Sequence, residues 1–221
     1  MRKIIVIDEG HSEGGKPDPG ASGNNLVESD LTGQIGDTVK RQLSGHEAEV
    51  LFTPRGTLSE RAAFANQVGA ALFVSLHVNA GGGTGYESHI YTHPSEQAAK
   101  IGEAVHKVMA AYYVGAGFKD RGLKRSNFAV LRETKMPAVL LENLFIDSVK
   151  DAEFLKVNIH AIGNEIAYAL VVALELQAKP LEVAKQDCET CPKLNKLFAE
   201  NQRMKNALAN ISISTAEYVI K

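Results

Sequence analysis

The chain has few cysteines and no long apolar run, and both absences limit what it can be. Of its 221 residues only two are cysteines, Cys188 and Cys191, so residues 1–187 do not depend on disulfide bonds for their stability. No apolar stretch approaches the roughly 18 residues that a membrane-spanning helix needs, so no transmembrane segment is expected. The first apolar run, residues 4–7, is too short for the core of a signal peptide. We therefore expect a soluble protein made in the cytoplasm.

The chain also lacks an excess of positive charge. Lys and Arg number 24 and Asp and Glu number 26, which gives a formal net charge of −2. A nucleic-acid-binding protein needs a basic surface for the phosphate backbone, so nucleic acid is not an expected partner. A GxxxxGK pattern begins at Gly10. A phosphate-binding loop requires Ser or Thr at the next position and continues from there into a helix, whereas this chain has Pro17 at that position. Nucleotide binding is therefore not expected either.

Short apolar runs alternate with segments of helical periodicity along the first 176 residues. The runs are rich in β-branched residues and almost continuously apolar, as in strands that are buried on both faces of a sheet. Thr57 and Glu60 have the spacing of a capping box, which starts a helix. The expected strands cover 4–7, 48–52, 70–77, 86–91 and 139–141, and the expected helices cover 31–43, 57–68, 95–112 and 157–176. The sequence predicts an α/β fold with a largely parallel or mixed twisted sheet and helices on both faces.

The alternation stops near residue 177, and Pro180 favours a linker. We predict one large domain over residues 1–177, a linker over 178–191 and a small, mainly helical C-terminal module over 192–221. Apolar positions and Asn201 follow a coiled-coil-like seam in this module, a pattern that favours self-association through residues 192–211. A single amphipathic helix that packs on its own domain is the alternative interpretation.

Residues suited to metal binding or proton transfer follow three of the expected strands. His11 comes shortly after 4–7, His77 ends 70–77 and Glu142 follows 139–141. In an open parallel sheet, catalytic groups gather at the carboxyl ends of the strands, so these side chains are expected to converge. Glu28, at the start of a helix, can reach the same edge.

Two imidazoles and one carboxylate, with a fourth position left for water, form the usual ligand set of a catalytic zinc. A further carboxylate is what a hydrolase needs as general base and acid. The residues match no local zinc motif such as HExxH, so their position on the fold carries the argument. The remaining histidines are interpreted as solvated residues of loops and helix faces: His46, His89, His93, His106 and His160. Of these, His89 and His93 could line a cleft.

Several ordered motifs give the chain a family resemblance. They are Asp8–His11, Asp18–Ala21 with Glu28, Thr53–Arg55 with Arg61, Ser75–Ala80, Arg121–Gly122 and Met136–Glu142. In this order they resemble the zinc-dependent N-acetylmuramoyl-L-alanine amidases of the amidase-3 family, over about residues 1–176. The resemblance implies hydrolysis of the amide bond between N-acetylmuramic acid and L-alanine in bacterial peptidoglycan.

The resemblance also implies roles for individual residues. It places one zinc ion on His11, Glu28 and His77 and makes Glu142 the catalytic acid and base. Candidate substrate contacts are Asn79, which could instead support His77, and Arg121. Asn143 stands where the family commonly has a small residue, which leaves the shape of the pocket open.

The missing signal peptide and the short C-terminal module together resemble a phage endolysin. Such a protein is made in the host cytoplasm and acts on the cell wall after release. Residues 192–221 would then bind the wall or promote self-association. Two other functions stay open: a different zinc peptidase or deacetylase that acts on cell-wall material, and a non-catalytic module that binds the wall.

Overall fold

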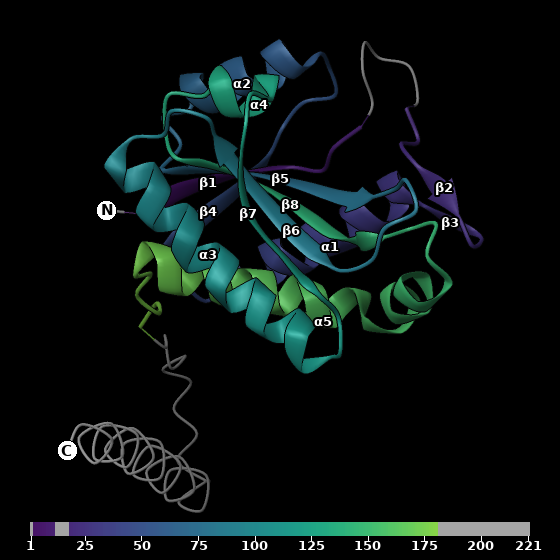
Figure 1. The fold of residues 1–221 in the computed structure, drawn as a ribbon. Coiled ribbons are helices and arrows are strands. Elements are labelled where there is room, and N and C mark those ends of the chain that lie inside the picture. Colours follow the sequence, from purple (N-terminus) through teal and green to yellow (C-terminus); the bar gives the residue numbers. More distant parts are fainter. Residues whose placement is uncertain (1, 12–17, 181–221) are drawn as a thin grey trace, which may run out of the picture. The chain divides into compact units, whose positions relative to one another are not determined.

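The computed structural model describes residues 2–11 and 18–180 and is built around one six-stranded sheet (Figure 1). The sheet order is β4–β1–β5–β8–β6–β7. The strands are β1 (Lys3–Asp8), β4 (Ala48–Phe52), β5 (Leu72–Asn79), β6 (Tyr86–Tyr91), β7 (Asp120–Ser126) and β8 (Ala138–Phe145). The first four strands in sheet order are parallel, β6 is antiparallel to β8, and β7 is parallel to β6. The predicted α/β fold with a mixed sheet is confirmed.

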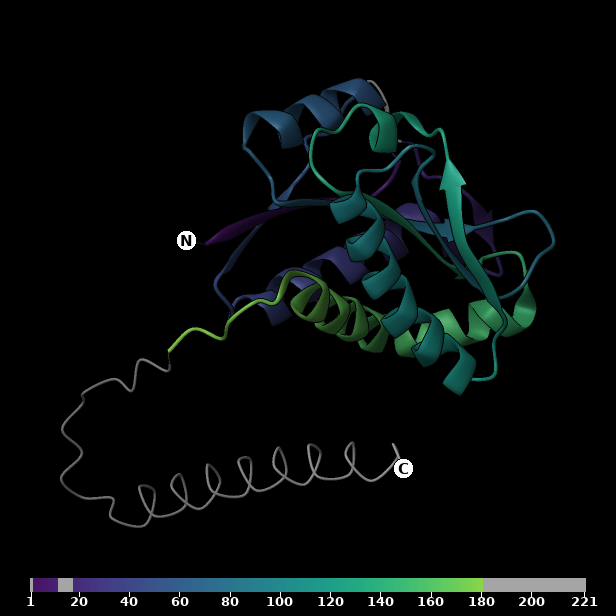
Figure 2. The ribbon, with the colours of Figure 1, turned by 60° about the vertical axis from the view of Figure 1, so that its left-hand side comes forward.

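The helices cover the two faces of the sheet unequally (Figures 1 and 2). One face carries α1 (Glu28–Leu43), α3 (Glu96–Gly115) and α5 (Val149–Leu174), and the other carries the short α2 (Leu58–Gln67) and α4 (Ala129–Arg132). A small hairpin of β2 (Ser22–Gly23) and β3 (Leu26–Val27) precedes α1. The capping box predicted at Thr57 and Glu60 is present at the start of α2.

Alternation along the strands decides which side chains meet which layer. In β1, Ile5 and Ile7 enter the large core under α1, α3 and α5, whereas Val6 enters the small core under α2 and α4. In β5 the side chain of Phe73 enters the same small core as Val6. Because side chains alternate with a period of two, His77 lies on this same lightly covered face. Glu142 lies there too, two residues after Leu140 of the small core.

Helix α5 has the length and apolar character of a membrane-spanning helix. Eleven of its residues are nevertheless buried, among them Leu155, Ile162 and Leu170, which belong to the large core. The helix packs along both α1 and α3. Core packing within the domain therefore accounts for its apolar character.

Strand β7 and the bounds of β8 and α5 differ from the expectation. Strand β7 is not among the predicted strands, because its sequence is charged and contains Gly122. It lies at the edge of the sheet, where charged residues are common and discourage pairing with other chains. Strand β8 extends to Phe145, well beyond the predicted 139–141, and α5 begins at Val149 instead of residue 157.

The predicted C-terminal module, 192–221, lies outside the described residues, and so does most of the predicted linker. The first residues of that linker belong to the domain. Ala178 forms a β-bridge with His46, and the backbone N–H of Lys179 donates to the carbonyl of Gly45 over 2.8 Å.

Candidate active site

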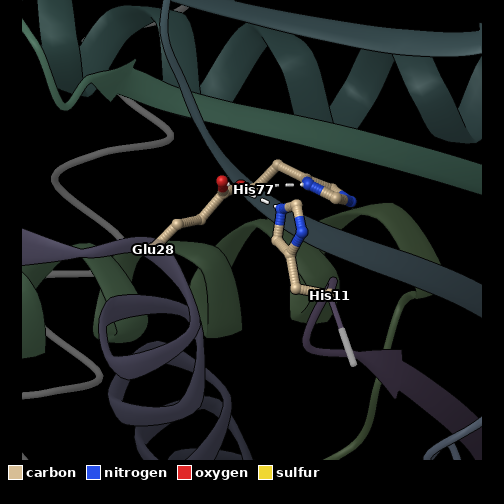
Figure 3. Close-up of side chains that lie close together, drawn as sticks. All are labelled: His11, Glu28 and His77. Atoms are coloured by element: carbon tan, nitrogen blue, oxygen red, sulfur yellow. Dashed lines mark hydrogen bonds and ion pairs between the residues drawn. The ribbon is translucent and has the colours of Figure 1, made fainter. Parts of the chain in front are cut away.

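Three of the predicted site residues come together where β1, α1 and β5 meet (Figure 3). His11 follows β1, Glu28 is the first residue of α1, and His77 lies in β5. Each offers a nitrogen or oxygen ligand atom, and these atoms all lie within 4.8 Å of one another. The structure thus gathers two imidazoles and one carboxylate in the space of a single metal ion.

Glu28 is the buried centre of this group, with 3% of its surface exposed. Its Oε1 accepts from the backbone N–H of Val78 at 3.0 Å and lies 3.1 Å from His77 Nδ1, while its Oε2 accepts from the N–H of Ala21 at 2.9 Å. Burial raises the pKa of Glu28, but its contacts with His11 and His77, and then those with the two backbone N–H groups, lower the pKa by more than burial raises it. The net pKa is therefore well below the ordinary value. The carboxylate is therefore ionised and fixed before any ligand binds.

His11 is held from one side and has a ring nitrogen directed toward the group. Its Nδ1 lies 3.1 Å from Asp18 Oδ2. Its Nε2 lies 2.9 Å from Glu28 Oε2 but is buried without a hydrogen-bond partner among the described residues, because the contact lacks hydrogen-bond geometry. Contact with the Glu28 carboxylate raises the pKa of His11 to about 9 against the opposing effect of burial.

Close packing around these side chains leaves no room for a Cβ at Gly20. Its φ is +66°, a conformation that favours glycine. A Cβ there would lie 2.5 Å from His11 Cδ2 and 2.6 Å from Glu28 Oε2. The glycine of the Asp18–Ala21 motif therefore lets the loop pass directly over both side chains.

A buried ion pair underlies the His11 loop. Asp8, the last residue of β1, and Arg61 of α2 are 1% and 2% exposed, and Arg61 Nη1 donates to Asp8 Oδ1 at 2.8 Å. Arg61 also donates through Nε to the carbonyl of Gly56 at 3.1 Å and through Nη2 to the carbonyl of His11. Asp8 accepts from Ser75 Oγ at 2.7 Å as well. Since His11 has a φ of +35°, which non-glycine residues seldom adopt, this network holds its backbone in an unfavourable conformation.

Glu142 lies beside His77 on the neighbouring strand, since the two residues are paired in the β5–β8 register. Its Oε2 is buried without a hydrogen-bond partner among the described residues. Burial raises the pKa of Glu142 to about 7, and the nearby His77 only partly opposes this. A carboxyl group with a pKa near neutrality can both accept and return a proton.

A pocket of about 350 Å³ opens in front of these groups. It is lined by His11, His77 and Glu142 together with apolar side chains of α2, the α4 region and β8. Of these apolar side chains, Leu58 and Phe128 are 38% and 43% exposed. The described residues therefore provide metal-binding groups, a proton-transfer group and an apolar wall around one cavity.

The two candidate substrate contacts lie elsewhere on the same face and do not line this pocket. Asn79 Nδ2 donates to Glu87 Oε1 at 3.3 Å, and Arg121 Nε donates to Glu87 Oε2 at 2.5 Å. The side chain of Asn79 thus contacts Glu87 and not His77. Nothing in the sequence marks Glu87 beyond its being the one carboxylate within the predicted strand 86–91.

Asn143 does not change the shape of the pocket. It is fully buried on the other face, where its Oδ1 accepts from Tyr113 Oη at 3.0 Å and its Nδ2 donates to the carbonyl of His77 at 3.1 Å. The interpretation of all remaining histidines as solvated is wrong for two of them. His89 lies buried in β6, and His106 of α3 is largely covered, with its Nδ1 2.8 Å from Ser88 Oγ.

Comparison with known proteins identifies relatives over the whole domain. The sequence pattern of the family described as N-acetylmuramoyl-L-alanine amidase matches residues 5–175. The chain is 41% identical over 180 residues to the sporulation-specific N-acetylmuramoyl-L-alanine amidase of Bacillus subtilis (strain 168), which covers 75% of this chain and 68% of that protein. It is also 41% identical over 168 residues to the endolysin of Bacillus phage SPP1, covering 71% of this chain and 59% of the endolysin.

Solved structures agree with the sequence relatives. The N-acetylmuramoyl-L-alanine amidase from Clostridium difficile 630 superimposes with a TM-score of 0.68 at 27% identity, over 78% of this chain and 95% of that one. The catalytic domain of an N-acetylmuramoyl-L-alanine amidase from Bacillus (Paenibacillus) polymyxa var. colistinus gives a TM-score of 0.66 at 28% identity, over 78% and 96% of the two chains.

Proposed function

This chain belongs to the N-acetylmuramoyl-L-alanine amidase family, amidase-3, and is a peptidoglycan amidase; from this premise we propose that it is a zinc enzyme that uses Glu142 as its acid and base. In this proposal His11, Glu28 and His77 hold one zinc ion. The bond cleaved joins the lactyl carbonyl of N-acetylmuramic acid to the nitrogen of L-alanine.

The donor set fits zinc. Nitrogen and carboxylate oxygen ligands without cysteine, and with a position open to a pocket, are typical of catalytic zinc sites. The observation that carries the proposal is the buried Nε2 of His11, which faces the Glu28 carboxylate without a hydrogen bond. Asp18 at Nδ1 of the same ring supports it, because zinc-binding histidines commonly have a carboxylate on their other nitrogen.

A zinc ion bound at these residues would polarise the amide carbonyl and lower the pKa of a water molecule. Glu142 removes the proton from the attacking water and then delivers it to the departing nitrogen of L-alanine. Burial raises the pKa of Glu142, which makes its carboxylate a stronger base toward the attacking water and leaves the resulting carboxyl group able to protonate the departing nitrogen. Leu58 and Phe128 line the same pocket with apolar surface.

The test is the release of new N-terminal alanine from purified peptidoglycan. Wild-type protein should release it, a chelator should abolish the release, and added zinc should restore it. Glu142→Gln should retain one zinc ion per chain but lose activity by roughly 10²–10⁴-fold, the usual contribution of a general acid–base group. His77→Ala should lose both zinc and activity. Glu103→Gln, an exposed change on α3 of the opposite layer, is the matched control and should keep both.

Two results would contradict this proposal. Cleavage only within the peptide stem would indicate a peptidase that uses the same site. Binding to the wall without any cleavage would indicate a non-catalytic module. Activity that survives complete removal of metal would contradict the zinc assignment alone.

We further propose a lytic role as a phage endolysin, which the similarity to the SPP1 endolysin supports. The similarity to a sporulation-specific amidase makes the spore wall the specific alternative. Lysis of vegetative cells, followed as loss of turbidity when the protein is added from outside, supports the lytic role. Cleavage of spore peptidoglycan with no effect on vegetative walls contradicts it.

The C-terminal residues 192–221 are proposed to bind the wall or to promote self-association. Sedimentation velocity of the full chain at several concentrations tests self-association, and cosedimentation of Glu142→Gln with intact walls tests wall binding. A concentration-independent monomer that stays in the supernatant would contradict both roles.

A further inference from the structure

A second cluster of charged side chains lies next to Glu142 on the same face of the sheet. Its centre is Glu87 of β6, which is paired with Glu142 in the β6–β8 register. Glu87 is 5% exposed. Residues directly opposite each other on adjacent strands have their Cβ atoms about 5 Å apart, so this cluster flanks the catalytic carboxyl group.

Two cations of the edge strand β7 bind the same oxygen of Glu87. Arg121 Nε and Lys124 Nζ lie 2.5 and 2.6 Å from Glu87 Oε2. The other oxygen, Oε1, is 3.3 Å from Asn79 Nδ2 and 3.4 Å from His89 Nε2. Although burial raises the pKa of Glu87, the two cations lower it to about 2, so the carboxylate is ionised. Glu87 therefore fixes both cationic side chains beside the pocket.

One carboxylate cannot neutralise two cations, so the cluster carries a surplus positive charge on its exposed side. The side chains of Arg121 and Lys124 remain 31% and 40% exposed. Arg121 also lies over the ring of Phe145, with 4.8 Å from its guanidinium carbon to the ring centre. Within the described residues, hydrogen bonding engages only Nε of Arg121, which leaves its two terminal nitrogens able to bind a carboxylate in bidentate fashion.

We propose that Arg121 and Lys124 form an anion subsite for a free carboxylate on the second residue of the peptide stem, the residue that follows L-alanine. This inference rests on the proposed function, because it takes Glu142 as the position of the scissile amide. Adjacent strands lie about 4.8 Å apart, and consecutive Cα atoms in a peptide lie 3.8 Å apart. Glu87, which holds the Arg121 guanidinium, is thus about one strand spacing from Glu142, a length comparable to one residue of the stem.

An ion-pair network that merely attaches the edge strand would have no need of a second cation. A single Arg–Glu pair satisfies that role, whereas Lys124 adds a second positive charge at the same carboxylate oxygen, and its side chain remains 40% exposed. The subsite also explains why the cations lie outside the pocket of the catalytic groups: they contact the stem beyond the bond that is cut. The enzyme is thus expected to distinguish stems by the charge of their second residue.

The experiment compares soluble peptidoglycan strands whose second stem residue is D-isoglutamate, with a free carboxylate, or D-isoglutamine, its amide. We expect wild-type protein to cleave the carboxylate strands with kcat/KM about tenfold higher, equivalent to about 1.4 kcal/mol, and mainly through KM. Arg121→Gln should reduce this preference to less than threefold, and Lys124→Gln should reduce it in part. High salt should weaken it in wild type, because partly exposed charges are screened.

Arg125→Gln is the matched control on the same strand. Arg125 pairs in register with Ile90, which packs against α3 on the opposite face, and its Nη1 donates to the carbonyl of Thr92 at 3.3 Å. This variant should keep the wild-type preference. Zinc content and thermal melting show whether each variant is folded. If Arg121→Gln does not fold, Lys124→Gln and the salt series test the subsite in its place.

Equal cleavage of both strands by wild-type protein would overturn the subsite while leaving the amidase function intact. A preference that persists unchanged in both Arg121→Gln and Lys124→Gln would also overturn it. Failure of wild-type protein to release N-terminal alanine from either strand would refute the proposed function, and the subsite with it.

Discussion

Replacing Arg61 by alanine should destabilise the domain strongly, because it leaves a buried carboxylate without its cation. Asp8 is 1% exposed and, among the described residues, would keep only its hydroxyl donors, Ser75 and Thr53. Removing one partner of a buried ion pair typically costs about 3–5 kcal/mol. In a domain of this size each kcal/mol lowers Tm by roughly 2–4 °C, so a decrease of roughly 6–20 °C is expected.

A double variant separates the stability of the pair from its effect on the site. Asp8→Asn with Arg61→Met removes both charges, and such replacements of a buried pair are often close to neutral. Its stability should therefore recover most of the loss. Its zinc affinity should stay low by roughly 10–100-fold, the usual effect of losing a group that orients a ligand, because the His11 carbonyl has lost its donor.

The assays are urea denaturation of metal-free protein and zinc titration against a competing chelator. Wild type and Glu103→Gln serve as references. A loss below about 1 kcal/mol in Arg61→Ala, the level of an exposed ion pair, would refute the argument from burial. Wild-type zinc affinity in the double variant would refute the claim that Arg61 positions His11.

Three further predictions concern the groups around the pocket. Burial raises the pKa of Glu142 in the metal-free folded state to about 7, so this state holds a proton that the unfolded chain has lost, and the free energy of unfolding falls as pH rises from 4.5 through 7. Glu142→Gln should therefore raise the free energy of unfolding at pH 8 by up to about 3 kcal/mol and have little effect at pH 4. Denaturant titrations at the two pH values test this. Since the pKa of His11 is raised to about 9, zinc must displace a proton, and calorimetry should find an affinity that rises about tenfold per pH unit up to pH 9; a flat profile would contradict the His11 assignment. Gly20→Ala should lose zinc and more than about 1 kcal/mol of stability from clashes at a positive φ, whereas Gly33→Ala, in α1 with open space around it, should be neutral or stabilising by about 1 kcal/mol; equal effects in thermal melts would refute the steric argument.

Local sequence determines much of this fold. The apolar runs that became β1, β5 and β8 are continuous because both faces of those strands are covered, and such a pattern is visible without coordinates. The capping box at Thr57 fixes the start of α2 through contacts only three residues apart. The expected convergence of His11, Glu28 and His77 also follows from order along the chain, since parallel strands end at one edge.

Contacts between distant segments decided the rest. The reversal of β6, and with it the pairing of Glu87 with Glu142, depends on sheet order, which no local pattern encodes. The Asp8–Arg61 pair joins residues 53 positions apart. The raised pKa of Glu142 results from burial by elements remote in sequence, and Asn143 faces away from the pocket because alternation turns it toward Tyr113. The residue types carry the chemistry, whereas burial and charge environment, which set how each residue acts, exist only once the chain is packed.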